Sequence, residues 1–142
     1  MDKYNCLKLE NQLCFPLYVC SKEIVKRYKP FLDELDLTYT QYIIMMVLWE
    51  HRSLSARDLG KYLYLDSGTL TPVLKTLEKK GFLTRRRSEK DERNLDVTIT
   101  EKGEFLKEKA VEIPEKMACC LELDKESASQ LYDLLHKILE KI

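Results

Sequence analysis

Glycine and proline are scarce in this chain: four of each among 142 residues leave little material for turns and loops. We therefore expect long regular elements rather than a loop-rich fold. No run of 18 apolar residues is present, so no membrane-spanning helix is expected. The opening Met1-Asp2-Lys3-Tyr4 does not resemble a signal peptide, and the sequence predicts a soluble, cytoplasmic protein.

Metal-binding patterns are also missing. The five cysteines include no C-x-x-C pair, and the two histidines, His51 and His136, are far apart in the sequence. An odd number of cysteines without metal-ligand spacing is typical of free thiols in a reducing compartment. We expect no metal site and no cofactor.

The chain has no net charge, yet its charges are unevenly distributed. Residues 75–93 hold eight basic and four acidic side chains, so this window carries a charge of +4 within a protein whose formal charge is zero. Most charged stretches are simply solvated surface. A local basic patch on a neutral protein is nevertheless what contact with a nucleic-acid backbone requires.

Apolar spacing predicts helices through most of the chain. Residues 8 to about 28 place apolar side chains three or four apart, and we expect this helix to stop before Pro30, with a short helical turn at 31–35. Thr38 or Thr40 can cap the next helix, whose run YIIMMVLWE is apolar nearly all round and belongs in the core. Thr100 can cap a long helix with a kink at Pro114, and a last amphipathic helix starts near Lys125.

The middle of the chain has a different order of elements. Ser55 can cap a short helix, and Asp66, Ser67 or Thr69 can cap a second, amphipathic one that ends at Gly81. The segments FLTRRR and LDVTIT then read as two strands joined by the polar linker SEKDERN. Two short helices followed by a basic hairpin predict a mainly α fold with a small β-hairpin wing, a winged helix-turn-helix.

We expect residues 1–142 to form one domain. The winged helix-turn-helix needs only about 35–100, so the apolar stripes of the helices in 1–30 and 103–142 exceed what that small core requires. These stripes can cover the domain within one chain. We favour dimerisation instead, because a helix-turn-helix protein gains affinity by contacting two half-sites one helical turn apart.

The stretch LYLDSGTLTPVLKTLEKKGFLTRRRSEKDERNLDVTIT resembles the MarR family of winged-helix repressors, and within it the OhrR-like regulators that sense organic hydroperoxide. The segments LENQLCF and RYKPFLDELDLTYTQY resemble the same branch, and the similarity covers about Leu9 to Ile113. The resemblance implies a cytoplasmic homodimeric repressor, not an enzyme, that binds an inverted repeat in double-stranded DNA. It implies DNA contacts from the second helix and the wing, namely Asp66, Ser67, Thr69, Thr71, Lys75, Arg85, Arg86, Lys90, Asp91 and Arg93, with Asp91 orienting Arg93 rather than contacting DNA.

The resemblance also implies a role for Cys14, which in OhrR-like proteins is oxidised by organic hydroperoxide and hydrogen-bonded by two tyrosines. The matching tyrosines here are Tyr28 and Tyr39. Cys14 and Tyr28 on one straight helix are about 21 Å apart at 1.5 Å per residue, so Tyr28 must come from the partner subunit. Pro16 departs from the family pattern: either the helix kinks there, or it starts so late that Cys14 lies in its first turn.

A second departure is the pair Cys119-Cys120, which resembles the two-cysteine subclass where a partner-subunit thiol forms a disulfide with the oxidised sensor. Either residue can be the resolving thiol, or both can simply be buried between helices. Cys6 and Cys20 are expected to be structural or incidental.

Two other functions are compatible with the sequence. A MarR regulator can respond to a small ligand such as an aromatic acid or haem, with the cysteines as bystanders and His51 or His136 as an axial ligand. A thiol peroxidase needs charge partners that activate the thiol. The residues next to Cys14 include no His or Arg, and an enzyme leaves the basic wing unexplained.

Overall fold

The computed structural model describes residues 2–142 and divides the chain into two compact units. The first unit extends to Val111, and the second covers Glu112–Ile142. Among the described residues, no helix is both long and apolar enough to cross a membrane.

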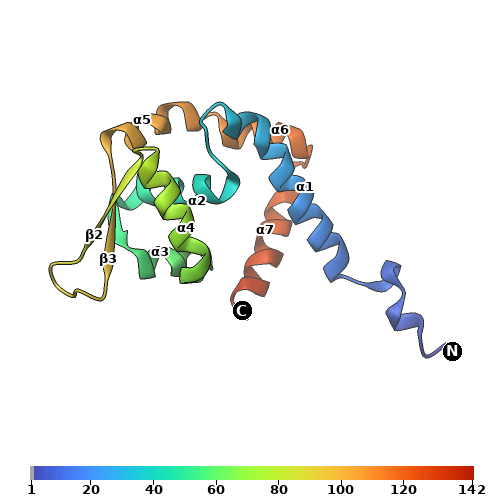
Figure 1. The fold of residues 1–142 in the computed structure, drawn as a ribbon. Helices are drawn as coiled ribbons and strands as arrows, with labels where there is room; N and C mark the ends of the chain where they lie inside the picture. The colour runs from blue at the N-terminus through green and yellow to red at the C-terminus, as the bar shows by residue number, and fades with distance from the viewer. Residues whose placement is uncertain (1) are drawn as a thin grey trace. The chain divides into compact units, whose positions relative to one another are not determined.

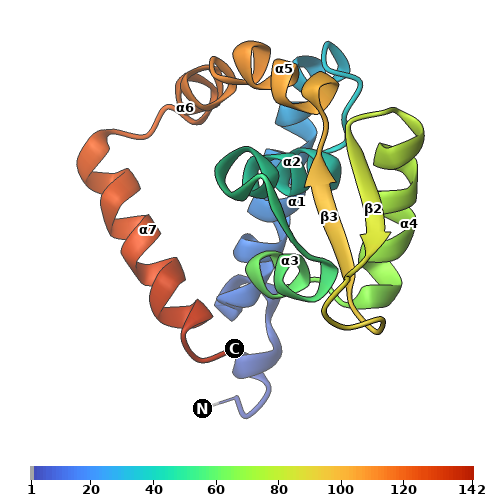
Figure 2. The same cartoon turned by 90° about the vertical axis from the view of Figure 1, so that its left-hand side faces the viewer.

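The first unit is a winged helix-turn-helix preceded by a long helix (Figures 1 and 2). Its mainly α composition with a small antiparallel sheet confirms the predicted fold class. In chain order its elements are two 3-10 turns (η1, Asn5–Leu7, and η2, Leu9–Asn11), α1 (Cys14–Asp33), α2 (Tyr39–His51), β1 (Ser53–Ser55), α3 (Ala56–Leu63), α4 (Ser67–Lys79), β2 (Leu83–Arg87), β3 (Leu95–Ile99) and α5 (Glu101–Ala110).

Helix α1 differs from the predicted 8–28 helix at both ends. It begins at Cys14, which puts Pro16 in the first turn, where its missing N–H removes no helical hydrogen bond. It continues through Pro30 to Asp33, so the predicted stop before Pro30 and the separate turn at 31–35 are wrong. Pro30 deprives only the carbonyl of Lys26 of its donor, and Lys26 is an exposed residue where water can replace that bond.

Helix α2 lies in the core, as its apolar run predicts. Ile44, Met45 and Leu48 are fully buried. Thr38 is the N-cap: its side chain accepts a hydrogen bond from the N–H of Gln41, and the Gln41 side chain accepts one from the N–H of Thr38. This reciprocal capping box fixes the turn between α1 and α2.

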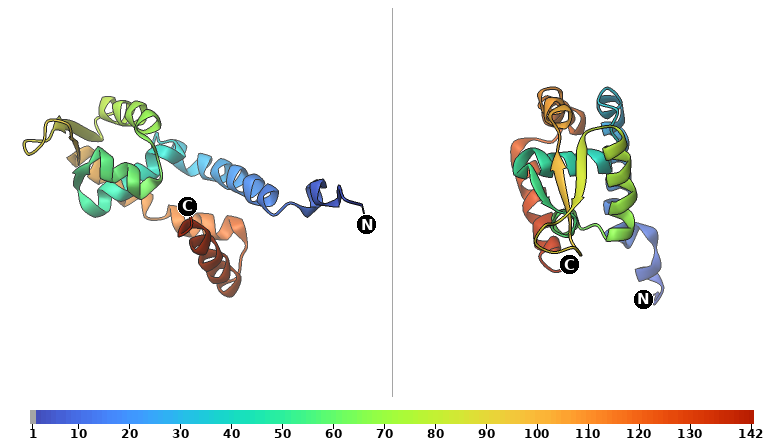
Figure 3. Two further views of the ribbon diagram at one scale, coloured as in Figure 1. Left: turned by 90° about the horizontal axis from the view of Figure 1, so that it is seen from below. Right: turned by 60° about the vertical axis from the view of Figure 1, so that its left-hand side comes forward.

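The sheet has the strand order β1-β3-β2, and all pairs are antiparallel. The hairpin of β2 and β3 confirms the predicted wing, with Leu83 opposite Ile99 and Arg87 opposite Leu95. Strand β1 was not predicted, because its three residues SLS are too short to show alternation. Figures 2 and 3 show β2 and β3 side by side, with α4 next to β2.

A predicted capping residue begins α3, and a tight turn joins this helix to α4. Ser55 accepts the N–H of Asp58 at the start of α3, and Tyr64 ends that helix with a left-handed backbone, φ 55°. Gly60 makes the tight turn feasible, because a Cβ there would lie 2.7 Å from the carbonyl oxygen of Leu65. Helices α3 and α4 are therefore joined by a short, tight turn.

The second unit contains α6 (Ile113–Leu121) and α7 (Lys125–Leu139). The predicted long helix kinked at Pro114 is wrong, since α5 ends at Ala110 and Pro114 lies at the start of a new helix. Pro is favoured at that position because its missing N–H is unpaired there in any case. Asp124 caps α7 through the N–H of Ser127.

The apolar stripes of the terminal helices are uncovered in the single chain. Helix α7 has no buried residue, and α1 buries only Leu32. The exposed side chains of the C-terminal stripe are Leu131, Leu134, Leu135, Ile138, Leu139 and Ile142. The dimerisation role of the terminal segments stays a prediction, which these surfaces favour.

Candidate functional site

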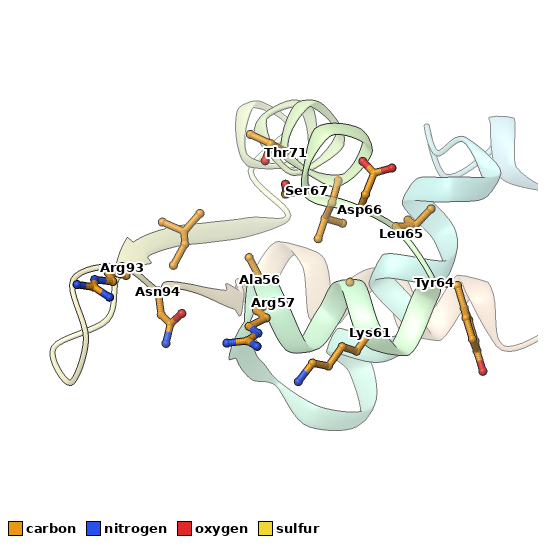
Figure 4. Close-up of a pocket in the computed structure, with 13 residues that line it drawn as sticks. Ala56, Arg57, Lys61, Tyr64, Leu65, Asp66, Ser67, Thr71, Arg93 and Asn94 are labelled. Carbon is orange, nitrogen blue, oxygen red and sulfur yellow. The ribbon is translucent and has the colours of Figure 1, made fainter. Parts of the chain in front are cut away.

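A hollow of about 850 Å³ lies between α3, the N-terminal end of α4 and the base of the hairpin (Figure 4). Three separate elements contribute basic or hydrogen-bonding side chains to it. They are Arg57 and Lys61 from α3, Ser67 and Thr71 from α4, and Arg93 and Asn94 from the hairpin. The helix-turn-helix and the wing thus contribute basic and hydroxyl side chains to one hollow.

At the start of α4, Asp66 is the N-cap. Its carboxylate accepts the N–H of Thr69 at 2.8 Å, which confirms one of the three predicted caps. Ser67 and Thr71, one helical turn apart, line the hollow. Thr69 and Lys75 are exposed on α4 outside the lining of the hollow. Asp66 thus fixes the helix end from which the two hydroxyls project.

The tip of the wing is ordered by its own side chains. Asp91 accepts the backbone N–H of Arg93 at 3.0 Å, and the N–H of Ser88 donates to the carbonyl of Asn94 at 2.8 Å. Asp91 therefore shapes the loop that carries Arg93, in line with the role predicted for it. Arg86 and Lys90 are exposed.

Arg85, at the base of the wing, is paired with a carboxylate of α4. Its side chain is only 18% exposed, and its guanidinium donates two hydrogen bonds to one carboxylate oxygen of Glu78, at 3.1 and 3.3 Å. The other oxygen accepts the N–H of Arg85 at 2.9 Å. These hydrogen bonds hold the pKa of the Glu78 carboxyl below its ordinary value. Arg85 fastens the wing to α4, and its expected DNA contact stays a prediction.

Arg57 and Lys61 are the residues of this surface that the sequence analysis missed. They lie four residues apart on α3, and Figure 4 shows both extending from that helix beside the hairpin. Both lie outside the basic window at 75–93. The available signal was the i, i+4 spacing of two cations on the polar side of a helix whose buried residue is Leu59.

Cys14 is the first residue of α1 and is exposed. This start position confirms the second of the two alternatives raised by Pro16. No side chain caps this helix end, since the N-cap residue Leu13 offers none. The thiol therefore lies in the first turn of α1, at the N-terminal end of the helix.

Tyr28 and Tyr39 lie together, with ring centroids 4.9 Å apart, and Tyr42 lies 5.8 Å from Tyr28. Burial raises the pKa of all three phenols, and their mutual proximity raises the pKa of Tyr28 and Tyr42 further. The phenols are thus protonated hydrogen-bond donors at neutral pH. Cys14 lies fourteen residues from Tyr28 along α1, about 21 Å, so its contact with these tyrosines in a second subunit stays a prediction.

Cys119 and Cys120 lie in α6 of the second unit, the first exposed and the second half-buried. Their part in a disulfide stays a prediction. Cys6 and Cys20 are exposed thiols.

The two histidines contact aromatic rings. His51 lies against Tyr62 with centroids 5.0 Å apart, and His136 stacks on Tyr132 at 3.8 Å. Within residues 2–142, no group of three or more His, Cys, Asp or Glu side chains is arranged to hold a metal ion.

The chain is similar over most of its length to known transcriptional regulators. The model of the transcriptional regulator SarA/Rot family matches residues 26–110. The organic hydroperoxide resistance transcriptional regulator of Bacillus subtilis is 49% identical over 141 residues, 99% of this chain and 96% of that protein. The regulator SarZ of Staphylococcus aureus is 45% identical over 133 residues, 94% of this chain and 90% of its own.

Solved structures of regulators are also similar to this chain. Reduced AbfR bound to DNA, from Staphylococcus epidermidis, superposes with a TM-score of 0.81 at 32% identity, covering 98% of this chain and 97% of AbfR. Its disulfide form gives 0.68 at 33% identity, covering 98% and 95%. These relatives are regulators, which supports the expectation of a non-enzyme over a thiol peroxidase. The predicted resemblance is confirmed: the chain belongs to the SarA/Rot family of winged-helix transcriptional regulators, with the MarR-type hydroperoxide regulators among its relatives.

Proposed function

We propose that this protein is a cytoplasmic, homodimeric repressor that binds an inverted repeat in double-stranded DNA and releases it when organic hydroperoxide oxidises Cys14. The observation that carries the proposal is the surface around the hollow, where α3, α4 and the wing present cations and hydroxyls together. A reducing cytoplasm keeps such a thiol ready for oxidation.

The surface suits a DNA duplex. Ser67 and Thr71 project from the N-terminal half of α4, the position from which a recognition helix contacts base edges in the major groove. Arg57 and Lys61 suit phosphates beside that groove. Arg93, on the wing, suits a narrow minor groove, whose negative potential attracts arginine.

A second subunit completes the protein in two respects. It covers the exposed apolar stripes of α1 and α7 and provides the second recognition helix. It also brings its Tyr28 and Tyr39 to Cys14, which a single straight α1 cannot do. The sensor is thus shared by two subunits whose DNA-binding parts must keep a fixed spacing.

The hydroperoxide is itself the oxidant in this reaction. The thiolate sulfur of Cys14 attacks the terminal peroxide oxygen and the O–O bond breaks, which leaves a sulfenic acid and an alkoxide that takes a proton from water to become the alcohol. The thiol of Cys119 or Cys120 in the partner can then attack this sulfur, forming a disulfide and releasing water. AbfR, solved both reduced on DNA and with a disulfide, supports such a pair of states.

The test is a DNA-binding assay in three steps. Reduced protein is expected to bind an inverted-repeat operator as a dimer, to lose affinity after organic hydroperoxide, and to regain it after reductant. A monomer by light scattering, or an affinity unchanged by oxidant, contradicts the proposal. An aromatic acid or haem that releases the DNA without oxidant would favour a ligand-responsive regulator.

Lys61→Ala tests the missed part of the surface. Its side chain is 67% exposed and lies in the hollow, so we expect it to neutralise one phosphate. The variant should bind every DNA sequence more weakly by the same factor, and the slope of log affinity against log salt should fall in magnitude by about 0.9. Lys109→Ala, which removes an exposed cation from α5, is the control and should leave the slope unchanged. An unchanged slope for Lys61→Ala would remove α3 from the interface.

A further inference from the structure

Lys80 directly follows α4, and its side chain is turned inward. The ammonium donates to the backbone carbonyl of Asp36 and, at 3.2 Å, to the side-chain oxygen of Gln41, and it pairs with the Asp36 carboxylate at 3.4 Å. An ammonium has three N–H donors, and here three oxygens surround it. The side chain is 23% exposed, so these contacts are better shielded than those of an ordinary surface lysine.

Two of these oxygens belong to Asp36, in the turn between α1 and α2, and the third belongs to Gln41 in the first turn of α2. Asp36 holds that turn with a left-handed backbone, φ 55°, and Gln41 is the buried member of the capping box with Thr38. Tyr39 lies between Thr38 and Gln41 in the chain and contacts Tyr28. Lys80 is hydrogen-bonded to Asp36 and Gln41, which flank Tyr39 in the chain, so a displacement of Tyr39 also displaces these hydrogen-bond acceptors.

The backbone around Lys80 is fastened in other directions as well. Its carbonyl accepts a hydrogen bond from the ammonium of Lys102 at 2.8 Å, and the carbonyl of Gly81 accepts the hydroxyl of Thr100 at 2.6 Å. Glu78, two residues earlier, holds Arg85 of the wing. The C-terminal end of α4 is thus the point where the recognition helix, the wing and α5 are joined.

We propose that Lys80 is the positioning residue that transmits the oxidation state of the thiol site from Tyr28 and Tyr39 to α4 and the wing. This inference rests on the proposed function, because it needs an operator and an oxidant-dependent release. Coupling between the thiol site and the DNA-binding surface requires a continuous chain of contacts between them. The hydrogen bonds of Lys80 connect the residues next to Tyr39 with the end of α4. The lysine acts through its partners in the turn and not by touching DNA.

Lys80→Met keeps the aliphatic stem and removes the ammonium. Operator affinity is measured for reduced and for hydroperoxide-treated protein, and the ratio of the two is compared with the parent. We expect the reduced affinity to stay within about threefold of the parent, while the ratio falls to near 1, because the coupling is lost. A merely structural lysine would weaken both states by one factor and leave the ratio unchanged.

Lys79→Met is the matched control, because it removes the same charge from the preceding, exposed residue. Its ratio is expected to equal that of the parent. Asp36→Asn is a second variant that removes only the carboxylate arm, and asparagine tolerates the left-handed backbone at this position. It should reduce the ratio by a smaller factor, and it decides the question if Lys80→Met does not fold.

The outcomes separate the two proposals. If the parent releases DNA on oxidation and both variants release it by the same factor, Lys80 does not transmit the signal. If the parent itself does not respond, the proposed function fails and the inference falls with it.

Discussion

Cys14→Ser is expected to bind operator DNA with the affinity of the parent and to stay bound after treatment with organic hydroperoxide. Serine occupies nearly the same volume at the start of α1 but cannot be oxidised to a sulfenic acid. In the proposed dimer, the added oxygen strains the contact of Cys14 with the partner's Tyr28 and Tyr39 by about 1–3 kcal/mol, the usual cost of overpacking. A coupling of that size corresponds to roughly 5–150-fold in affinity, which is the loss we expect the parent to show on oxidation.

Cys20→Ser is the matched control, since Cys20 is another exposed thiol on the same helix. It should respond to oxidant like the parent. Affinity is measured by titration of a labelled operator before and after the oxidant is added. Release of DNA by oxidised Cys14→Ser would show that Cys14 is not the sensor.

The oxidised parent also provides a covalent readout. If Cys119 or Cys120 resolves the sulfenic acid, the oxidised protein should run as a reducible dimer on denaturing gels. Replacing each cysteine singly should identify the partner, and replacing both should abolish the band. A dimer band that persists without both residues would assign the disulfide to another thiol.

Gly103→Ala is expected to destabilise the fold by about 3 kcal/mol, at the upper end of the usual range for overpacking. A Cβ at this position would lie 2.1 Å from the carbonyl oxygen of Phe82 and 2.9 Å from Cγ1 of Ile99. The carbonyl of Gly103 also accepts the indole N–H of Trp49 at 3.0 Å. Relieving the clash therefore moves α5 away from Phe82, from the end of β3 and from Trp49 of α2.

Thermal and urea unfolding of the two proteins measure this effect, and the midpoint should fall by roughly 10 °C. Gly68→Ala is the control, because a Cβ there would meet only the Asp66 side-chain oxygen at 3.2 Å, in an exposed helix. Its stability should change by less than about 1 kcal/mol. Equal stabilities of Gly103→Ala and the parent would mean that the α5 contact is loose.

The sequence by itself determined the order of the elements and most of their caps. Thr38, Ser55, Asp66 and Thr100 each accept an N–H at a helix start, as predicted. Capping depends on one side chain and the backbone three residues later, so it can be read locally. The hairpin could also be predicted from neighbouring residues, because the alternation of apolar and polar side chains and the polar linker specify both strands.

Helix boundaries near proline needed the structure. Pro16 marks a start, Pro30 lies inside α1, and Pro114 begins a new helix. The residue type is the same in each case, and the outcome depends on whether the neighbouring carbonyl has another partner or solvent. That information is not contained in the sequence pattern.

Only the tertiary structure decided the partners of the charged and aromatic side chains. Arg85 and Arg86 are adjacent and chemically identical, yet Arg85 is paired with Glu78 and Arg86 is exposed. Lys80 is likewise paired with Asp36, whereas the adjacent Lys79 is exposed. Tyr28 contacts Tyr39 only because α1 packs on α2. Local patterns fix helices, strands and caps, since those interactions span a few residues. Contacts between side chains distant in sequence depend on how the finished elements pack, and they decide which cations are available to DNA.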